Sequence, residues 1–80
     1  MENKQLLEKY DKTLEELLNE DIKLNLSFLE IIIFSQTIFD KMEEIQTKED
    51  YNKDDKEYAF KIKLKAQKVI DNTIIDLLQD

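Results

Sequence analysis

Several residue types are missing from this 80-residue sequence: it has no cysteine, histidine, glycine, proline, arginine or tryptophan. Without cysteine and histidine there is no disulfide bond, no reactive thiol and no zinc site of the usual ligand types. The two serines have no histidine to activate them as nucleophiles, and a phosphate-binding loop or an EF-hand loop requires glycine. The sequence therefore predicts a protein that is not an enzyme and that binds no metal ion or other cofactor.

The lack of glycine and proline also bears on the fold, because these residues make tight turns and end helices. A β-rich fold with several hairpins is hard to build without them. The longest unbroken apolar run, residues 31–34, is far shorter than the about 20 residues of a membrane span. The N-terminus also lacks the basic and apolar regions of a signal peptide. We therefore expect a helical protein of the cytoplasm.

Acidic residues dominate the charge. Nineteen acidic residues outnumber twelve lysines, which gives a net charge of −7. This charge opposes contact with a phosphate backbone, so we expect no direct binding of DNA or RNA. The abundance of Lys, Ile, Asn, Asp and Glu indicates an AT-rich coding sequence, as in a bacterium or its phage.

The most apolar stretch spans residues 26–45, and we expect the rest of the chain to be arranged around it. We predict a helix over residues 24–47, which starts or restarts at Ser27, because Ser27 and Glu30 fit the capping-box pattern. Its apolar residues point in nearly every direction, so it is expected to be buried nearly all round or to form a subunit interface. The broad face predicted to be buried contains Phe28, Ile31, Ile32, Phe34, Ile38, Phe39, Met42 and Ile45.

Two more helices are predicted to cover the central one. Apolar residues recur at helical spacing within residues 3–20, and two apolar stripes run along residues 55–79. The polar residues 48–54 are expected to form a loop, and residues 54–57 resemble a second capping box that starts the last helix. The chain is thus predicted to be a single all-α domain, either a three-helix bundle or a helical hairpin-type bundle.

One alternative fold remains open. Residues 22–28 and 60–66 each alternate apolar and polar with a period of two, which favours strands. Paired with each other, these segments would form a two-stranded ribbon lying against helices, in an α+β fold.

The central helix supplies the candidate interface. Two neighbouring helices cover little more than half of its circumference, which leaves Leu29 and Ile33 without a partner in a three-helix bundle. Because an 80-residue chain also has a thin core, we expect a homodimer that forms through this helix. The predicted interface consists of Leu26, Leu29, Ile32, Ile33 and Gln36.

Lys61, Lys65 and Lys68 form a basic line on one face of the last predicted helix. This face is either solvated, with the alkyl stems covering apolar edges, or a contact for an acidic partner. The Glu-rich first helix of another subunit is one such partner.

Ser35, Gln36 and Asp40 resemble the Ser-Gln-x-x-Asp motif of the small two-helix phosphatases of sporulating bacteria. Here the aspartate comes one residue late, which turns it about 100° away from the face that the motif requires. The resemblance therefore implies no phosphatase activity for this chain.

The leading hypothesis is a small acidic interaction protein, an adaptor or inhibitor that presents a helical surface to another protein of a host or phage. One alternative is an acidic mimic of nucleic acid that inhibits a DNA-binding or defence enzyme. Another is a structural or assembly subunit of a phage particle. All three require only helices and a surface.

Overall fold

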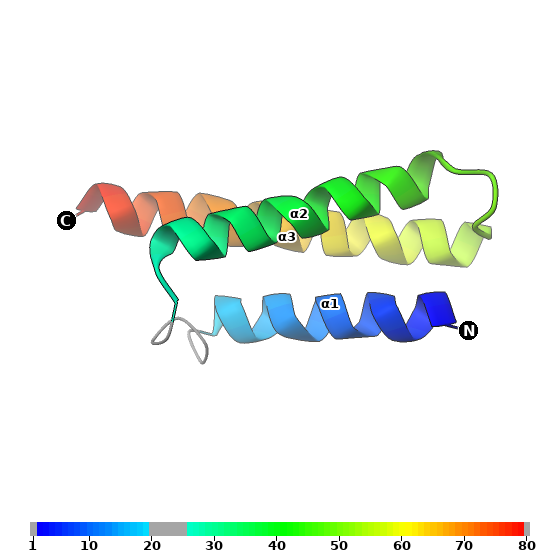
Figure 1. Cartoon of the computed structure of the whole chain (residues 1–80), viewed down its shortest axis with the longest axis horizontal. Coiled ribbons are helices and arrows are strands. Elements are labelled where there is room, and N and C mark those ends of the chain that lie inside the picture. Colours follow the sequence, from blue (N-terminus) through cyan, green and yellow to red (C-terminus); the bar gives the residue numbers. More distant parts are fainter. Residues whose placement is uncertain (1, 20–25, 80) are drawn as a thin grey trace.

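The computed structural model describes residues 2–19 and 26–79, and over these residues the chain forms three helices (Figure 1). They are α1 (Glu2–Leu18), α2 (Phe28–Thr47) and α3 (Lys53–Gln79). The described residues contain no strand, so the predicted all-α fold is confirmed. Residues 60–66 lie within α3, and the strand alternative is therefore wrong for them. Most of its other half, residues 22–25, lies outside the described residues.

The start of α2 is fixed by the predicted capping box. The Ser27 Oγ accepts a hydrogen bond from the Glu30 backbone N–H at 3.1 Å, and the Ser27 N–H donates to the Glu30 Oε1 at 3.3 Å. Because Ser27 has an extended backbone, with φ −72° and ψ 160°, the helix begins at Phe28. Residues 26 and 27 are therefore not helical, although the predicted helix included them. Residues 24 and 25, where that helix was predicted to start, lie outside the described residues.

The start of α3 differs from the prediction. The helix begins at Lys53, two residues before the expected position, because Asn52 caps it: the Asn52 Oδ1 accepts a hydrogen bond from the Asp55 N–H at 2.8 Å. Asp54 and Asp55 lie inside the first turn, where their charges favour the positive end of the helix dipole. The connection between α2 and α3 is therefore residues 48–52, shorter than the loop predicted from the sequence.

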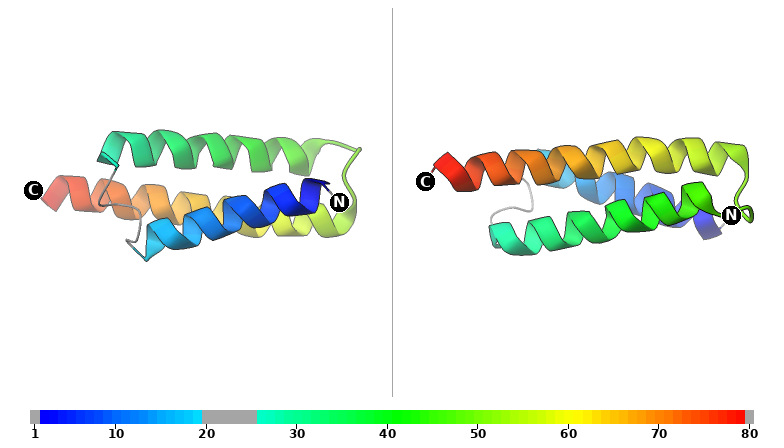
Figure 2. Two further views of the ribbon diagram at one scale, coloured as in Figure 1. Left: turned by 60° about the horizontal axis from the view of Figure 1, so that its bottom comes forward. Right: turned by 90° about the horizontal axis from the view of Figure 1, so that it is seen from above.

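The helix at the centre of the fold is α3, not α2 as predicted. The two run side by side in opposite directions over most of their length, whereas α1 lies against α3 and has little contact with α2 (Figures 1 and 2). With 27 residues, α3 is long enough to serve both neighbours. Its buried residues from Ala59 to Thr73 recur at intervals of three and four, apart from the adjacent pair Val69 and Ile70, and Tyr58 and Lys65 beside them contact α1.

The core lies along the seam of the three helices. In α2 the buried residues recur at alternating intervals of four and three, as in a coiled coil. This burial covers one face only, so α2 is not buried nearly all round within the described chain, and the subunit interface, the other half of that expectation, stays a prediction. The buried side chains are Leu7, Leu14, Leu17, Ile31, Ser35, Ile38, Met42, Ile45, Ala59, Ile62, Ala66, Val69, Ile70 and Thr73.

In the part of the chain that the structure describes, no helix combines the length and the apolar character needed to cross a membrane.

Candidate functional site

Large apolar side chains are exposed mainly at one end of the molecule, where α2 begins and α3 ends (Figure 1). Leu29 is 65% exposed and Ile33 is 56% exposed, and the two lie four residues apart on the outer face of α2. Single exposed apolar residues are common on protein surfaces, but contiguous groups mark interaction sites. The full set comprises Leu6, Leu29, Ile33, Phe34, Phe60, Leu64, Ile74, Ile75, Leu77 and Leu78.

An apolar groove of about 540 Å³ opens between α1 and α2. It exists because α1 packs against α3 and has little contact with α2, which leaves the seam between α1 and α2 open along part of its length. We call it the α1/α2 groove. Its lining consists of Thr13, Leu17, Leu26, Glu30, Ile33, Phe34 and Thr37.

The polar side chains of the α1/α2 groove are engaged within their own helices. Thr13 donates from its Oγ1 to the Lys9 carbonyl at 2.8 Å, and Thr37 donates to the Ile33 carbonyl at 2.9 Å. Glu30 belongs to the capping box of α2. The groove therefore mainly offers apolar surface, which suits the apolar face of an amphipathic helix.

The residues predicted for the interface differ in their surroundings. Leu26 and Ile33 line the α1/α2 groove, and Leu29 lies beside them on the outer face of α2. Ile32 is half-buried, on the opposite flank of α2 from the groove. Gln36 is exposed, and its Nε2 donates to the Asp40 Oδ1 at 2.9 Å. Leu29, Ile32, Ile33 and Gln36 are spaced i, i+3, i+4 and i+7, so they share one side of α2, and of the predicted set only Leu26 and Ile33 line the groove.

Sequence reasoning missed the other residues of the groove. Phe34 was expected on the buried face of α2, yet it is exposed along the groove wall. Thr37 and, from α1, Thr13 and Leu17 complete the lining. No local pattern indicates these residues, because the groove depends on how far α1 lies from α2.

The three predicted lysines have different surroundings along α3. Lys65 is used inside the chain: its Nζ lies 2.5 Å from the Asp11 Oδ1 and 2.8 Å from the Glu15 Oε1, which ties α3 to α1. Lys68 is exposed beside the seam of α1 and α3. Lys61 lines a separate pocket near the connection between α2 and α3.

Asp11 also accepts a hydrogen bond from the Tyr58 hydroxyl at 3.0 Å, so one carboxylate serves two side chains of α3. Partial burial raises the pKa of the Tyr58 hydroxyl, and the bond to Asp11 raises it further. Burial alone would lower the pKa of Lys65, but its hydrogen bonds to Asp11 and Glu15 outweigh that effect, and the pKa is raised. Both groups therefore hold their protons more tightly because of the contact between α1 and α3.

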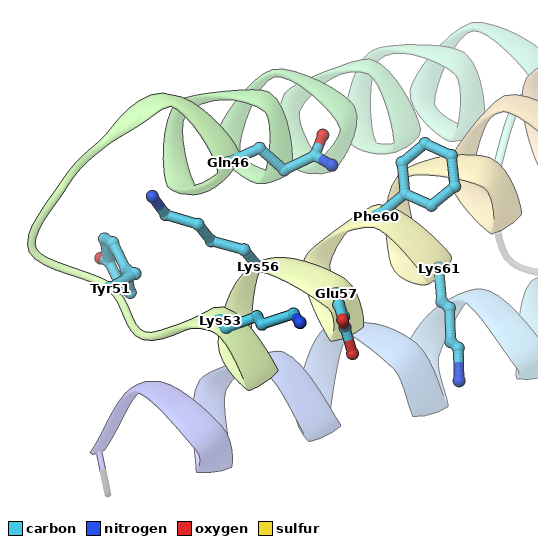
Figure 3. Close-up of a pocket in the computed structure, with 7 residues that line it drawn as sticks. All are labelled: Gln46, Tyr51, Lys53, Lys56, Glu57, Phe60 and Lys61. Carbon is cyan, nitrogen blue, oxygen red and sulfur yellow. The ribbon is translucent and has the colours of Figure 1, made fainter.

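The pocket that contains Lys61 is a shallow basic site of about 680 Å³ (Figure 3). In Figure 3 the ammonium groups of Lys53, Lys56 and Lys61 point in different directions, and Glu57 lies among them. A site that holds an anion needs donors that converge on one position. The arrangement of these lysines therefore does not form an anion cradle. The lining consists of Gln46, Tyr51, Lys53, Lys56, Glu57, Phe60 and Lys61.

The residues that resemble the phosphatase motif do not meet in one site. Ser35 is fully buried in the core, and its Oγ has no hydrogen-bond partner among the described residues. Gln36 and Asp40 bind each other on the exposed side of α2. Over the described residues, no group of three or more acidic side chains is placed to hold a metal ion.

Comparison with known proteins gives no match for this chain: no protein-family model, no curated protein and no solved structure corresponds to it.

Proposed function

We propose that this protein is a small acidic helical interaction module of the cytoplasm, an adaptor or inhibitor of a host or phage protein, without catalytic activity or cofactor. It acts through the α1/α2 groove and the adjoining outer face of α2, and it forms a homodimer through α2. The observation that carries the proposal is the apolar groove with Leu29 and Ile33 exposed beside it.

Apolar surface of this kind is the usual mark of a protein–protein contact site on a small soluble domain. An amphipathic helix places anchors at positions i, i+3 or i+4, and i+7 into such a groove. The lining supports this kind of ligand, because its threonines are already bonded to their own helices and require no partner. A polar small molecule would find few groups to bind there.

The energetics favour a weak to moderate homodimer. Burying one fully exposed Leu or Ile side chain is worth about 1.5–3 kcal/mol. Because Leu29 and Ile33 are 65% and 56% exposed, the four side chains of two subunits supply roughly 4–7 kcal/mol before the entropy of association is subtracted. Both side chains are more than half exposed, so most of this area is available for burial.

The nucleic-acid mimic has less support. Lys65 neutralises Asp11 and Glu15, while Lys41 and Lys48 both contact Glu44. These ion pairs interrupt the negative surface that a mimic of a phosphate backbone requires.

Sedimentation equilibrium at micromolar concentration tests the dimer. We expect the wild type to exceed the monomer mass of 9.6 kDa and Ile33→Glu to sediment as a monomer. Gln67→Glu is the matched control, since it adds the same charge at an exposed site on α3. Circular dichroism verifies that both variants keep their helices. A wild type that stays at 9.6 kDa contradicts the dimer.

Affinity capture from the native host tests the adaptor or inhibitor role. The same three baits are compared by quantitative mass spectrometry. We expect a partner that is retained by the wild type and by Gln67→Glu but lost with Ile33→Glu. Equal recovery with all three baits would show that the groove does not bind the partner.

A further inference from the structure

We propose that the dimer is reciprocal: the C-terminal end of α3 in each copy lies in the α1/α2 groove of the other. In the absence of another partner, the occupant of the groove is thus a second copy of this chain. This inference builds on the proposed function and names the contact that the dimer uses.

The first observation is an overhang. At its C-terminal end α3 extends past both α1 and α2 (Figure 1). After Thr73, no residue of α3 up to Gln79 is buried. We call residues 74–79 the α3 tip, which at about 1.5 Å per residue is about 9 Å long.

The α3 tip is apolar despite its exposure. Ile74, Ile75 and Leu77 are 39–51% exposed, and Leu78 is 78% exposed. Leu77 follows the buried Thr73 by four residues, so it lies on nearly the same face of the helix. At this end α3 extends past the start of α2, so α2 does not run alongside the tip (Figure 1). The tip therefore presents apolar surface that none of the described residues buries.

The second observation is that the tip and the groove lie at the same end of the molecule. Leu17 is near the end of α1, and Leu26 and Ile33 are near the start of α2, beside the region where α3 projects (Figures 1 and 2). A two-fold axis at this end places each tip over the groove of the other copy. Had the two features been at opposite ends, the same contact would have produced an open filament.

The available area fits a weak, reversible dimer. The exposed fractions of the apolar side chains at this end correspond to about four fully exposed side chains. At about 60–120 Å² each, they provide roughly 250–500 Å² of apolar surface per subunit. Since interfaces are about 60% apolar, the total is about 400–800 Å² per subunit, at the lower edge of specific interfaces. The side chains counted are Leu29, Ile33, Phe34, Ile74, Ile75, Leu77 and Leu78.

The α1/α2 groove and the α3 tip are both mainly apolar. The α1/α2 groove favours apolar groups, because its polar side chains already form hydrogen bonds within α1 and at the start of α2. Four of the six residues of the tip are apolar, and there is no basic residue in the last turn of α3. The contact is therefore mainly hydrophobic rather than ionic.

Disulfide cross-linking tests the contact, and the cysteine-free sequence makes the experiment clean. Purified Leu78→Cys and Thr37→Cys are mixed and oxidised, and the linked peptides are identified by mass spectrometry. Mixing two single-cysteine variants excludes a bond within one chain. We expect a disulfide between position 78 of one copy and position 37 of the other. Gln67→Cys replaces Leu78→Cys as the control, and we expect no such bond, since Gln67 lies on α3 far from its tip.

A second variant separates this inference from the proposed function. We expect Leu78→Asp to weaken the dimer at least about tenfold, while Leu64→Asp, at another exposed leucine of α3, leaves it unchanged. A dimer that Ile33→Glu disrupts but that neither cross-links nor responds to Leu78→Asp would overturn the reciprocal contact and leave the dimer through α2 in place. A wild-type monomer would overturn the reciprocal contact and leave the groove to a foreign partner.

Discussion

At the scale of single residues, the hydroxyl of Ser35 is unusual because it is buried and unsatisfied. It lies in the apolar core and has no hydrogen-bond partner among the described residues, whereas the other buried hydroxyl, that of Thr73, donates to the Val69 carbonyl at 2.7 Å. An unsatisfied buried polar group costs about 1–3 kcal/mol. Ser35 therefore lowers the stability of a chain whose core is already small.

We predict that Ser35→Ala raises the free energy of unfolding by about 1–2 kcal/mol, because it removes the unsatisfied hydroxyl with almost no change in volume. Urea unfolding followed by circular dichroism measures the change. Thr73→Val is the control, since it removes a hydroxyl that has a partner, and we expect no such gain. A loss of stability in Ser35→Ala would mean that the hydroxyl has a partner in solution.

The contact of Asp11 with Tyr58 and Lys65 is expected to make the free energy of unfolding fall at alkaline pH. Both groups have folded-state pKa values raised above their ordinary values of 10.0 and 10.5, so each binds its proton more tightly in the folded chain. Their contribution to stability is therefore complete below the ordinary pKa values and is lost as the pH rises through the raised ones.

We predict that the free energy of unfolding falls as the pH rises above about 10, and that this fall is shallower in Lys65→Met and in Tyr58→Phe. Urea unfolding at a series of pH values measures the slope. Lys61→Met is the control and keeps the slope of the wild type, because Lys61 is exposed and does not contact Asp11. Identical slopes in all four proteins would show that the contact contributes nothing in solution.

At the scale of elements, the capping box of Ser27 and Glu30 decides where α2 begins. It also sets the position of Leu26 and Glu30, which line the start of the α1/α2 groove. The cap is therefore important both for the stability of α2 and for the shape of the candidate site.

We predict that Ser27→Ala lowers the free energy of unfolding by about 0.5–2 kcal/mol, because the Glu30 N–H loses its acceptor. Thermal and urea unfolding measure the loss. Thr47→Ala is a control at the other end of the helix, where the hydroxyl bonds only to the Glu44 carbonyl. An equal effect of the two substitutions would mean that the box does not fix the start of α2.

The existence of the three helices was easier to predict from the sequence than the residues at which they begin and end, or which helices pack against each other. Ser27 and Glu30 indicated a start or restart at Ser27, where α2 is capped, but the predicted helix began at residue 24, because the pattern did not exclude an earlier start. Asn52 and Asp54 are both good caps, and local pattern does not decide between them; the chain uses Asn52. The density of apolar residues in α2 suggested burial all round, but density does not state how many helices are available to cover a surface.

At the scale of the whole molecule, the candidate site was only partly predictable. Leu29 and Ile33 were identified because their helical positions lie opposite the main apolar face. The α1/α2 groove and the α3 tip depend on the spacing of α1 and α2 and on the relative lengths of α2 and α3. Those quantities arise from packing in three dimensions, which a single sequence does not show.

Because α1 packs mainly against α3, it is held to the rest of the chain by fewer contacts than α2 and α3 make with each other. The α2–α3 hairpin shares a long seam, whereas α1 is held mainly by Leu7, Leu14 and Leu17 and by the contacts of Asp11 with α3. Segments with a smaller share of the core open more often than the molecule unfolds as a whole. The α1 helix should therefore detach as a unit while the hairpin stays folded.

We predict that in native-state hydrogen exchange the amides of α1 exchange together and faster than the core amides of α2 and α3. Exchange followed by mass spectrometry resolves the three helices. Equal protection of all three would show that the chain opens only as a whole. Each such opening would remove one wall of the α1/α2 groove and expose the buried leucines of α1. The width of the groove would then vary with time, and the contacts between α1 and α3 would decide how often it changes.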